Sequence, residues 1–178
     1  MKDSYQNSFR FFNKKQFPKN NANKSLILAA HELKTPENMG AIIRLAANLG
    51  AEKVYFIHEN FVVKESKLKR VAHSSIEKVD YEIVNKNDFW KAINGTTVIA
   101  LETTTQSSNL FKTLLPEHCV ILCGNERFGL PNDFIEKCKK SVFIPMPGIT
   151  RSMNVSHALT IAAFEWSRQH LSEQMNLE

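Results

Sequence analysis

Cysteine is scarce in this sequence, with three among 178 residues. Cys119, Cys123 and Cys138 cannot all pair with one another. Cys119 and Cys123 lie in an apolar, strand-like run, which favours buried thiols over metal ligands. The six histidines show neither His-x-x-x-His nor Cys/His zinc spacing, so no metal centre is expected. This cysteine usage is typical of a cytoplasmic protein.

The sequence also lacks long hydrophobic runs and two common nucleotide-binding motifs. The N-terminus has no apolar h-region and no later stretch is long enough to span a bilayer, so we expect neither a signal peptide nor a membrane partner. No G-x-x-x-x-G-K-[ST] occurs, which argues against a P-loop nucleotidase. No G-x-G-x-x-G follows an early strand, which argues against a Rossmann dinucleotide site and a Rossmann-type methyltransferase.

Excess positive charge is confined to an N-terminal arm, residues 1–24. The arm holds six basic side chains and one acidic one, whereas the rest of the chain holds 17 of each sign. Lys and Arg neutralise phosphates and aromatic rings stack on unpaired bases, so the arm is predicted to be flexible and to bind RNA. The alternative is a tail whose aromatic side chains dock on the domain. These aromatic residues are Tyr5, Phe9, Phe11, Phe12 and Phe17.

Residues 25–178 are expected to form one α/β domain. Short apolar runs alternate with helical patterns, which predicts a largely parallel sheet flanked by helices. No internal repeat or Gly/Ser linker marks a second domain. Strands are expected at Leu26–Ala30, Val54–His58, Tyr81–Val84, Val98–Leu101, Val120–Cys123 and Val142–Pro145. Helices are expected at Met39–Leu49, around Val63–Ala72, and at Asp88–Ile93, Asn132–Lys139 and Val155–His170.

The first and last of these helices have informative faces. Arg44 lies opposite the apolar side of the first helix, either as a solvated side chain or facing a ligand, and Gly50 is expected to end that helix. The last helix is apolar nearly all round, which predicts burial inside the domain or at a subunit interface. Asn154 directly precedes it and can cap its N–H groups.

Two loops each follow an expected strand and precede an expected helix. Residues 124–131 read GNERFGLP, and residues 145–154 read PMPGITRSMN. In open α/β sheets, ligands bind outside the carboxyl ends of the strands, so two such loops predict a binding site. Gly124 is expected to let the backbone approach a ligand closely.

Three segments together resemble the SpoU/TrmH family of the SPOUT methyltransferases. The likeness runs over roughly residues 25–170, in order and at family spacing. It implies an S-adenosylmethionine-dependent enzyme that methylates a ribose 2′-hydroxyl in RNA. Residues 36–44 (PENMGAIIR) resemble the first family motif, residues 124–131 the second, and residues 144–148 (IPMPG) with residues 152–156 (SMNVS) and Glu165 the third.

The resemblance also implies a fold, a cofactor site and an assembly. The C-terminal segment of the family threads through a loop to form a deep trefoil knot, and its members are usually homodimers that bind RNA across both subunits. The knotted loops hold S-adenosylmethionine in a bent shape, largely through backbone groups. Carried over by position, the cofactor contacts are Leu101, Thr103, Gly124, Ile144, Met146, Ser152 and Met153.

Five residues are expected to serve catalysis by the same resemblance. Arg44 matches the family's catalytic arginine, sometimes described as the general base. Because removing a proton from an arginine near pH 7 costs about 8 kcal/mol, we favour a charged Arg44 that grips the adjacent phosphate and stabilises developing alkoxide. Glu126 is expected to orient this centre. Asn38, Ser152 and Asn154 are expected to hold the loops or the ribose, with structural capping as the alternative for the two asparagines.

The resemblance leaves the RNA open. We favour tRNA over rRNA, because compact members without an extra domain often act on tRNA. One alternative is a non-catalytic RNA-binding SPOUT module, which the three intact motifs argue against. The other is a SPOUT base methyltransferase, which the pairs Asn38/Arg44 and Ser152/Asn154 argue against.

Overall fold

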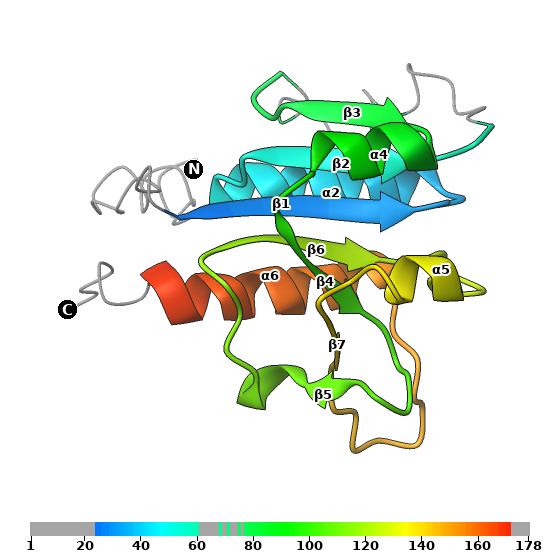
Figure 1. Cartoon of the computed structure of the whole chain (residues 1–178), viewed down its shortest axis with the longest axis vertical. Coiled ribbons are helices and arrows are strands. Elements are labelled where there is room, and N and C mark those ends of the chain that lie inside the picture. Colours follow the sequence, from blue (N-terminus) through cyan, green and yellow to red (C-terminus); the bar gives the residue numbers. More distant parts are fainter. Residues whose placement is uncertain (1–23, 61–67, 69–70, 72–74, 76, 172–178) are drawn as a thin grey trace, which may run out of the picture.

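The computed structural model describes residues 24–60, 68, 71, 75 and 77–171. Its centre is a sheet in the order β3-β2-β1-β6-β4-β7-β5, and every pairing between these strands is parallel (Figure 1). The predicted α/β fold with a largely parallel sheet is therefore confirmed. The strands are β1 (Ser25–His31), β2 (Lys53–Ile57), β3 (Tyr81–Val84), β4 (Thr97–Leu101), β5 (Ser108–Asn109), β6 (His118–Cys123) and β7 (Lys140–Phe143).

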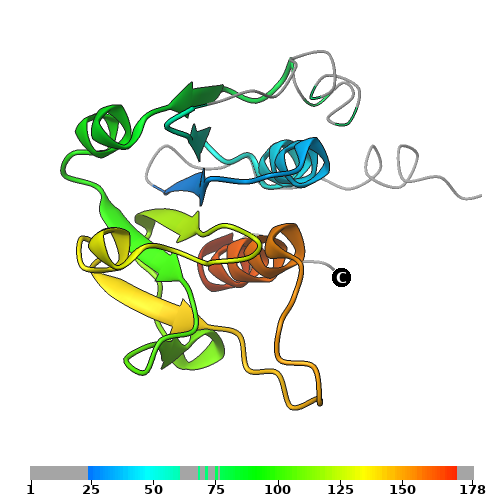
Figure 2. The same ribbon diagram turned by 90° about the vertical axis from the view of Figure 1, so that its right-hand side faces the viewer.

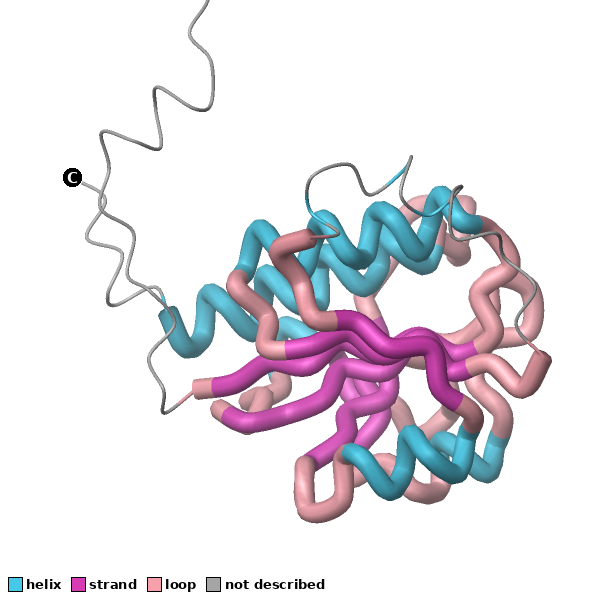
Figure 3. The backbone as a smooth tube through the Cα atoms, turned by 90° about the horizontal axis from the view of Figure 1, so that it is seen from above, coloured by secondary structure: helices cyan, strands magenta, loops and turns pink. Residues whose placement is uncertain are grey.

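Helices cover both faces of the sheet. The two long helices, α2 (Pro36–Leu49) and α6 (Val155–Leu171), lie side by side on one face (Figure 2). The short helices α4 (Lys86–Ala92) and α5 (Asn132–Ile135) lie on the other face (Figure 3). A short 3-10 turn, η2 (Leu110–Lys112), follows β5. Among the helices that the structure describes, none is both long and apolar enough to cross a bilayer.

The alternation of side chains along the strands explains these two layers. Successive residues of a strand point to opposite faces of a sheet. Leu28 and Ala30 of β1 pack into the core beneath α2 and α6, whereas Ala29 between them packs into the second core beneath α4 and α5. Both faces of the central strands are thus buried, which is why these strands appear in the sequence as continuous apolar runs.

The ends of the two long helices follow the sequence signals. The Thr35 side chain accepts a hydrogen bond from the Asn38 N–H and caps α2, and Pro36 occupies its first turn. Gly50 ends α2 with φ 63°, in the left-handed region, as predicted. Asn154 Oδ1 accepts from the Ser156 N–H at 2.9 Å, so the predicted cap of α6 is confirmed.

Some predictions about where helices and strands begin and end need correction, and others concern residues that the structure does not describe. The helix predicted at Asn132–Lys139 is wrong in length, because α5 ends at Ile135 and the chain turns before β7. The two-residue strand β5 was not predicted, since two residues carry no periodicity. The helix around Val63–Ala72 lies almost entirely outside the described residues. So does the N-terminal arm, except Lys24, whose Nζ donates to the His170 carbonyl at 2.7 Å.

Candidate functional site

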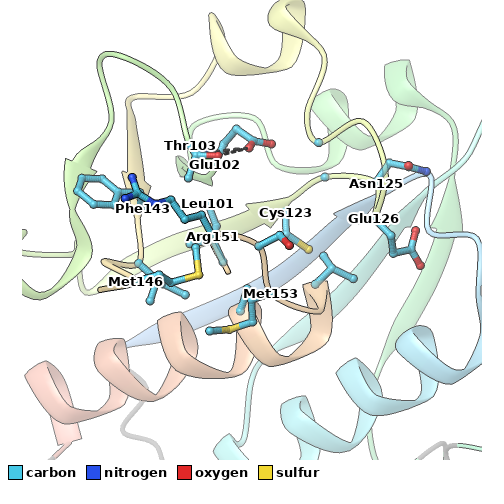
Figure 4. A pocket seen from close by; sticks show the side chains of 16 residues that line it. Leu101, Glu102, Thr103, Cys123, Asn125, Glu126, Phe143, Met146, Arg151 and Met153 are labelled. Carbon is cyan, nitrogen blue, oxygen red and sulfur yellow. Dashed lines mark hydrogen bonds between the residues drawn. The ribbon is translucent and has the colours of Figure 1, made fainter. Parts of the chain in front are cut away.

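A cavity of about 210 Å³ lies at the carboxyl ends of β4, β6 and β7, beside the start of α6 (Figure 4). This is the edge where parallel sheets bind ligands. All seven residues predicted to contact the cofactor line this cavity: Leu101, Thr103, Gly124, Ile144, Met146, Ser152 and Met153. The structure therefore brings together residues that are up to 52 positions apart, although their individual roles stay predictions.

Sequence reasoning missed several other residues that line the same cavity. Phe143, Val155 and Ala158 extend its apolar wall, whereas Glu102 and Arg151 add charge. Figure 4 shows Asn125 and Glu126 at one end of the cavity and Phe143 and Met146 at the other. The position of Glu102 directly after a buried strand was the signal available for that residue. The remaining lining residues are Cys123, Asn125, Glu126 and Gly129.

A tight turn after β6 forms one wall of the cavity. Asn125 and Gly129 bridge the turn through paired backbone hydrogen bonds of 3.0 and 2.9 Å, and Gly129 has φ 68°. The Glu102 carboxylate accepts from the Leu130 N–H at 2.8 Å, which ties this turn to the end of β4. A Cβ atom on Gly124 would lie 2.1 Å from the Gly129 carbonyl carbon. The turn's own backbone therefore requires glycine at 124, a reason that differs from the close ligand approach we expected.

Glu126 joins the turn to the start of α2. Asn38 Nδ2 donates to Glu126 Oε1 at 2.8 Å, and the Lys34 N–H donates to Glu126 Oε2 at 3.1 Å. Asn154 Nδ2 in turn donates to Asn38 Oδ1 at 3.1 Å. Three of the five predicted catalytic residues thus form one chain of hydrogen bonds, Glu126–Asn38–Asn154, drawn from all three motifs.

The environment of Glu126 favours its charged form. Partial burial opposes ionisation, but the hydrogen bonds from the Asn38 side chain and from nearby backbone N–H groups outweigh it and lower the pKa of Glu126. The carboxylate therefore accepts hydrogen bonds at neutral pH. Because its acceptor role is fixed, the Asn38 amide must present its NH₂ to Glu126 and its oxygen to Asn154.

The other two predicted catalytic residues lie differently. Ser152 is exposed and lines the cavity. Arg44 does not line it. Arg44 is exposed nearly two turns after Asn38, about 9 Å along the helix axis, and lines a separate surface hollow together with Thr160 and Phe164 of α6. A single copy of the chain therefore places Glu126 and Ser152 on the cavity, connects Asn38 and Asn154 to it through Glu126, and leaves Arg44 on the outer face of α2.

The motif geometry agrees with a comparison of the whole sequence. The profile of the SpoU rRNA Methylase family matches residues 25–164. The chain belongs to the SpoU rRNA methylase family. This match confirms the family assignment made from the three segments. Together, the same segments of this SpoU-family protein supply lining residues of the cavity and the hydrogen bonds that join Glu126, Asn38 and Asn154.

Relatives with assigned names support the same family. A protein of Mus musculus named tRNA (guanosine(18)-2'-O)-methyltransferase TARBP1 is 32% identical over 152 residues, which is 82% of this chain and 10% of the mouse protein. An AdoMet-bound rRNA methyltransferase from Sinorhizobium meliloti matches with a TM-score of 0.75 and 27% identity, over 83% of this chain and 57% of that one. A structure described as concerning the 2-OH methylation of C/U34 on tRNA matches with a TM-score of 0.75 and 30% identity, over 83% and 97%. The chain thus spans a tenth of the mouse protein but nearly all of the last structure.

Proposed function

We propose that this chain transfers a methyl group from S-adenosylmethionine to a ribose 2′-hydroxyl of RNA. One observation carries the proposal: Glu126 belongs both to the cavity and to the chain of hydrogen bonds with Asn38 and Asn154. A ligand in the cavity and a ribose beside the two asparagines would therefore meet at one place. The names of the relatives, which are tRNA and rRNA 2′-O-methyltransferases, support the same reaction.

The lining of the cavity fits S-adenosylmethionine. Apolar side chains such as Leu101, Ile144 and Met146 suit an adenine ring, whereas the exposed Ser152 and the buried backbone of Gly124, which borders the cavity, offer polar partners. When bound, the cofactor supplies an electrophilic methyl group on a sulfonium centre. The described residues around the cavity contribute position and hydrogen bonds, and positioning can supply a large part of the barrier reduction.

The residues beside the cavity suit a ribose. Asn38 is buried and hydrogen-bonded on both sides of its amide, so its orientation is fixed before any substrate arrives. We propose that Ser152 and Asn154, which are exposed, contact the ribose, and that Glu126 holds Asn38 in place. Pre-set polar groups of this kind stabilise developing charge without reorganising during the reaction.

We propose that Arg44 acts across a homodimer. Arg44 lies in the hollow between the outer faces of α2 and α6, where Phe164 is 49% exposed although it is large and apolar. A second copy packed on these faces would cover Phe164 and bring Arg44 of one chain towards the cavity of the other. There the charged guanidinium would hold a phosphate and stabilise the forming alkoxide.

Two further features belong to the proposal. We infer that the segment after β7 threads a loop to form the family's trefoil knot; the position of β7 between β4 and β5 in the sheet supports this.

We also propose tRNA as the favoured substrate and rRNA as the other. The near-complete match to the structure concerned with tRNA supports tRNA, and the Sinorhizobium rRNA methyltransferase supports rRNA.

Two measurements test the function. Titration calorimetry should detect binding of S-adenosylmethionine to the purified chain. Incubation with labelled cofactor and either bulk tRNA or rRNA, followed by digestion and mass spectrometry of nucleosides, should yield a 2′-O-methylated nucleoside. Binding without transfer to either RNA would favour a non-catalytic module, and a methylated base would favour a base methyltransferase.

A further inference from the structure

The turn that forms one wall of the cavity also holds an aromatic ring in solvent. Phe128 is 73% exposed, although it lies only two residues after Glu126. The Asn125 side chain fixes the turn beneath it, because Asn125 Oδ1 accepts from the Arg127 N–H at 2.8 Å and from the Phe128 N–H at 3.3 Å. The ring is therefore presented by an ordered turn. A single exposed hydrophobic side chain is common, so exposure alone indicates nothing.

Two cations flank this ring. Lys34 Nζ lies 5.4 Å from the centre of the Phe128 ring, and Arg127 Cζ lies 5.1 Å from it. Both side chains are exposed, and within the described part of the chain neither has an acidic partner. The group thus combines a flat apolar surface with two positive charges that form no salt bridge with any carboxylate among the described residues.

The cation–aromatic group is also fixed relative to the proposed catalytic residues. The Lys34 N–H donates to Glu126, which binds Asn38. Arg127 and Phe128 directly follow Glu126 in the turn. Lys34 comes from the loop before α2, and Arg127 and Phe128 come from the turn after β6. Their side chains therefore meet at one exposed place beside the cavity.

We propose that Phe128 stacks on an unpaired base of the substrate RNA, next to the nucleotide that is methylated, while Lys34 and Arg127 bind the flanking phosphates. RNA offers both halves of this match, because it carries flat bases and regularly spaced negative charges. An acidic protein would match the cations but not the ring. The inference rests on the proposed RNA substrate and adds to it a contact that selects a single-stranded position.

The test compares Phe128→Ala with Phe128→Tyr, which keeps a ring, and with Phe111→Ala, which removes another exposed phenylalanine (50% exposed) from η2. Binding is measured with a labelled single-stranded RNA dodecamer of mixed sequence. Loss of one stacked base should weaken binding about 5- to 150-fold in Phe128→Ala. Phe128→Tyr and Phe111→Ala should bind as the unaltered protein does. Unchanged binding by Phe128→Ala would overturn the proposal.

Salt dependence and fluorescence separate stacking from charge. Lys34→Ala and Arg127→Ala should each flatten the log–log salt slope of RNA binding by about 0.7, whereas Phe128→Ala should keep it.

Phe128→Trp adds an exposed fluorescent reporter. The RNA should quench its fluorescence, and heparin, a polyanion without bases, should not. Equal quenching by both, or a loss of dimer in Phe128→Ala on sedimentation, would overturn the proposal. Cofactor binding, measured in parallel on every variant, should be unchanged, so a failure of stacking is distinguishable from a failure of the proposed function.

Discussion

Asn38 and Glu126 are 88 residues apart in the sequence, and their side chains meet in a hydrogen bond of 2.8 Å. This contact joins the first turn of α2 to the turn after β6. Asn38 is buried, so the bond exists in a place where an unpaired amide would be costly. The relationship makes the start of α2 and the wall of the cavity one unit, and several predictions depend on it.

Glu126→Gln should loosen this unit. A glutamine can still accept one hydrogen bond, but it loses the charge that strengthens the bonds from Asn38 and from the Lys34 N–H. We expect a large loss of methyl transfer and a loss of stability of about 1–3 kcal/mol, measured by chemical unfolding. Glu136→Gln, at an exposed position after α5, is the matched control and should change neither.

The stability difference between Glu126→Gln and the unaltered protein should depend on pH. The pKa of Glu126 is lowered in the folded protein, so its stabilising effect is present above the ordinary carboxyl pKa and is lost as pH falls through the folded value. Unfolding curves at about pH 7 should therefore separate the two proteins, and the separation should shrink as the pH falls below the ordinary glutamate pKa of about 4.3. A difference that persists in acid would show that the carboxylate charge is not involved.

Arg44→Ala should abolish methyl transfer and leave the affinity for S-adenosylmethionine unchanged, because Arg44 does not line the cavity. Arg44→Lys should also be poor, since lysine lacks the planar, forked donor geometry. The proposed action across a dimer makes a sharper prediction. Mixing Arg44→Ala with Ala158→Phe, which fills the cavity, should restore activity in mixed dimers. If methyl transfer does not recover in mixed dimers whose two copies are both folded, Arg44 acts on the cavity of its own chain.

Gly124→Ala should damage both binding and folding. The added Cβ would meet the Gly129–Leu130 backbone at 2.1–2.3 Å, so the turn must move. We expect a lower melting temperature and a severe loss of cofactor affinity by calorimetry. Gly148→Ala is the matched control, because its Cβ would have no atom within 4 Å. Normal affinity in Gly124→Ala would mean that the turn can shift without harm to the cavity.

The three cysteines should be inert in the folded protein. Burial raises the pKa of Cys119, Cys123 and Cys138 to about 12 each, so the thiols stay protonated at pH 8. A chromogenic disulfide reagent should detect almost no thiol in the native protein and all three in guanidinium. Rapid reaction of one thiol before unfolding would reveal local opening around that residue.

Deleting residues 1–23 tests the predicted arm and leaves Lys24 with its contact to His170. If the arm binds phosphates, RNA binding should weaken and its log–log salt slope should become shallower by about 0.7–0.9 for each lost contact. Cofactor binding should persist. Identical affinity and slope in both proteins would assign the arm no part in RNA binding.

Much of this fold could be predicted because its signals are local. Buried parallel strands such as β6 are continuous apolar runs, and Gly50 and Asn154 mark helix ends by their own chemistry. The cavity residues were found through resemblance, since spacing along the chain does not show that Leu101 and Ser152 share one wall. The position of Arg44 away from that wall depends on how α2 packs against α6, and periodicity showed only that Arg44 faces away from its own core.

The reason for glycine at 124 was also beyond local reasoning. It depends on the path of the chain at Gly129 and Leu130, which are not neighbours of Gly124 in any regular element. The sequence could show that a small residue was needed there. Only the assembled turn shows that the neighbouring backbone, rather than a ligand, occupies the space.

The cavity takes its wall from β4, β6, β7 and also from Val155 and Ala158 of α6, the last helix that the structure describes. A chain emerging from the ribosome has made every strand that the structure describes before it has made that helix. The cavity, and with it the proposed cofactor site, is therefore incomplete until synthesis has passed residue 158 and α6 has docked. Partly synthesised copies lack Val155, Ala158 or the docked helix around them, and a ligand bound in the completed cavity would favour the finished fold over every partly docked form.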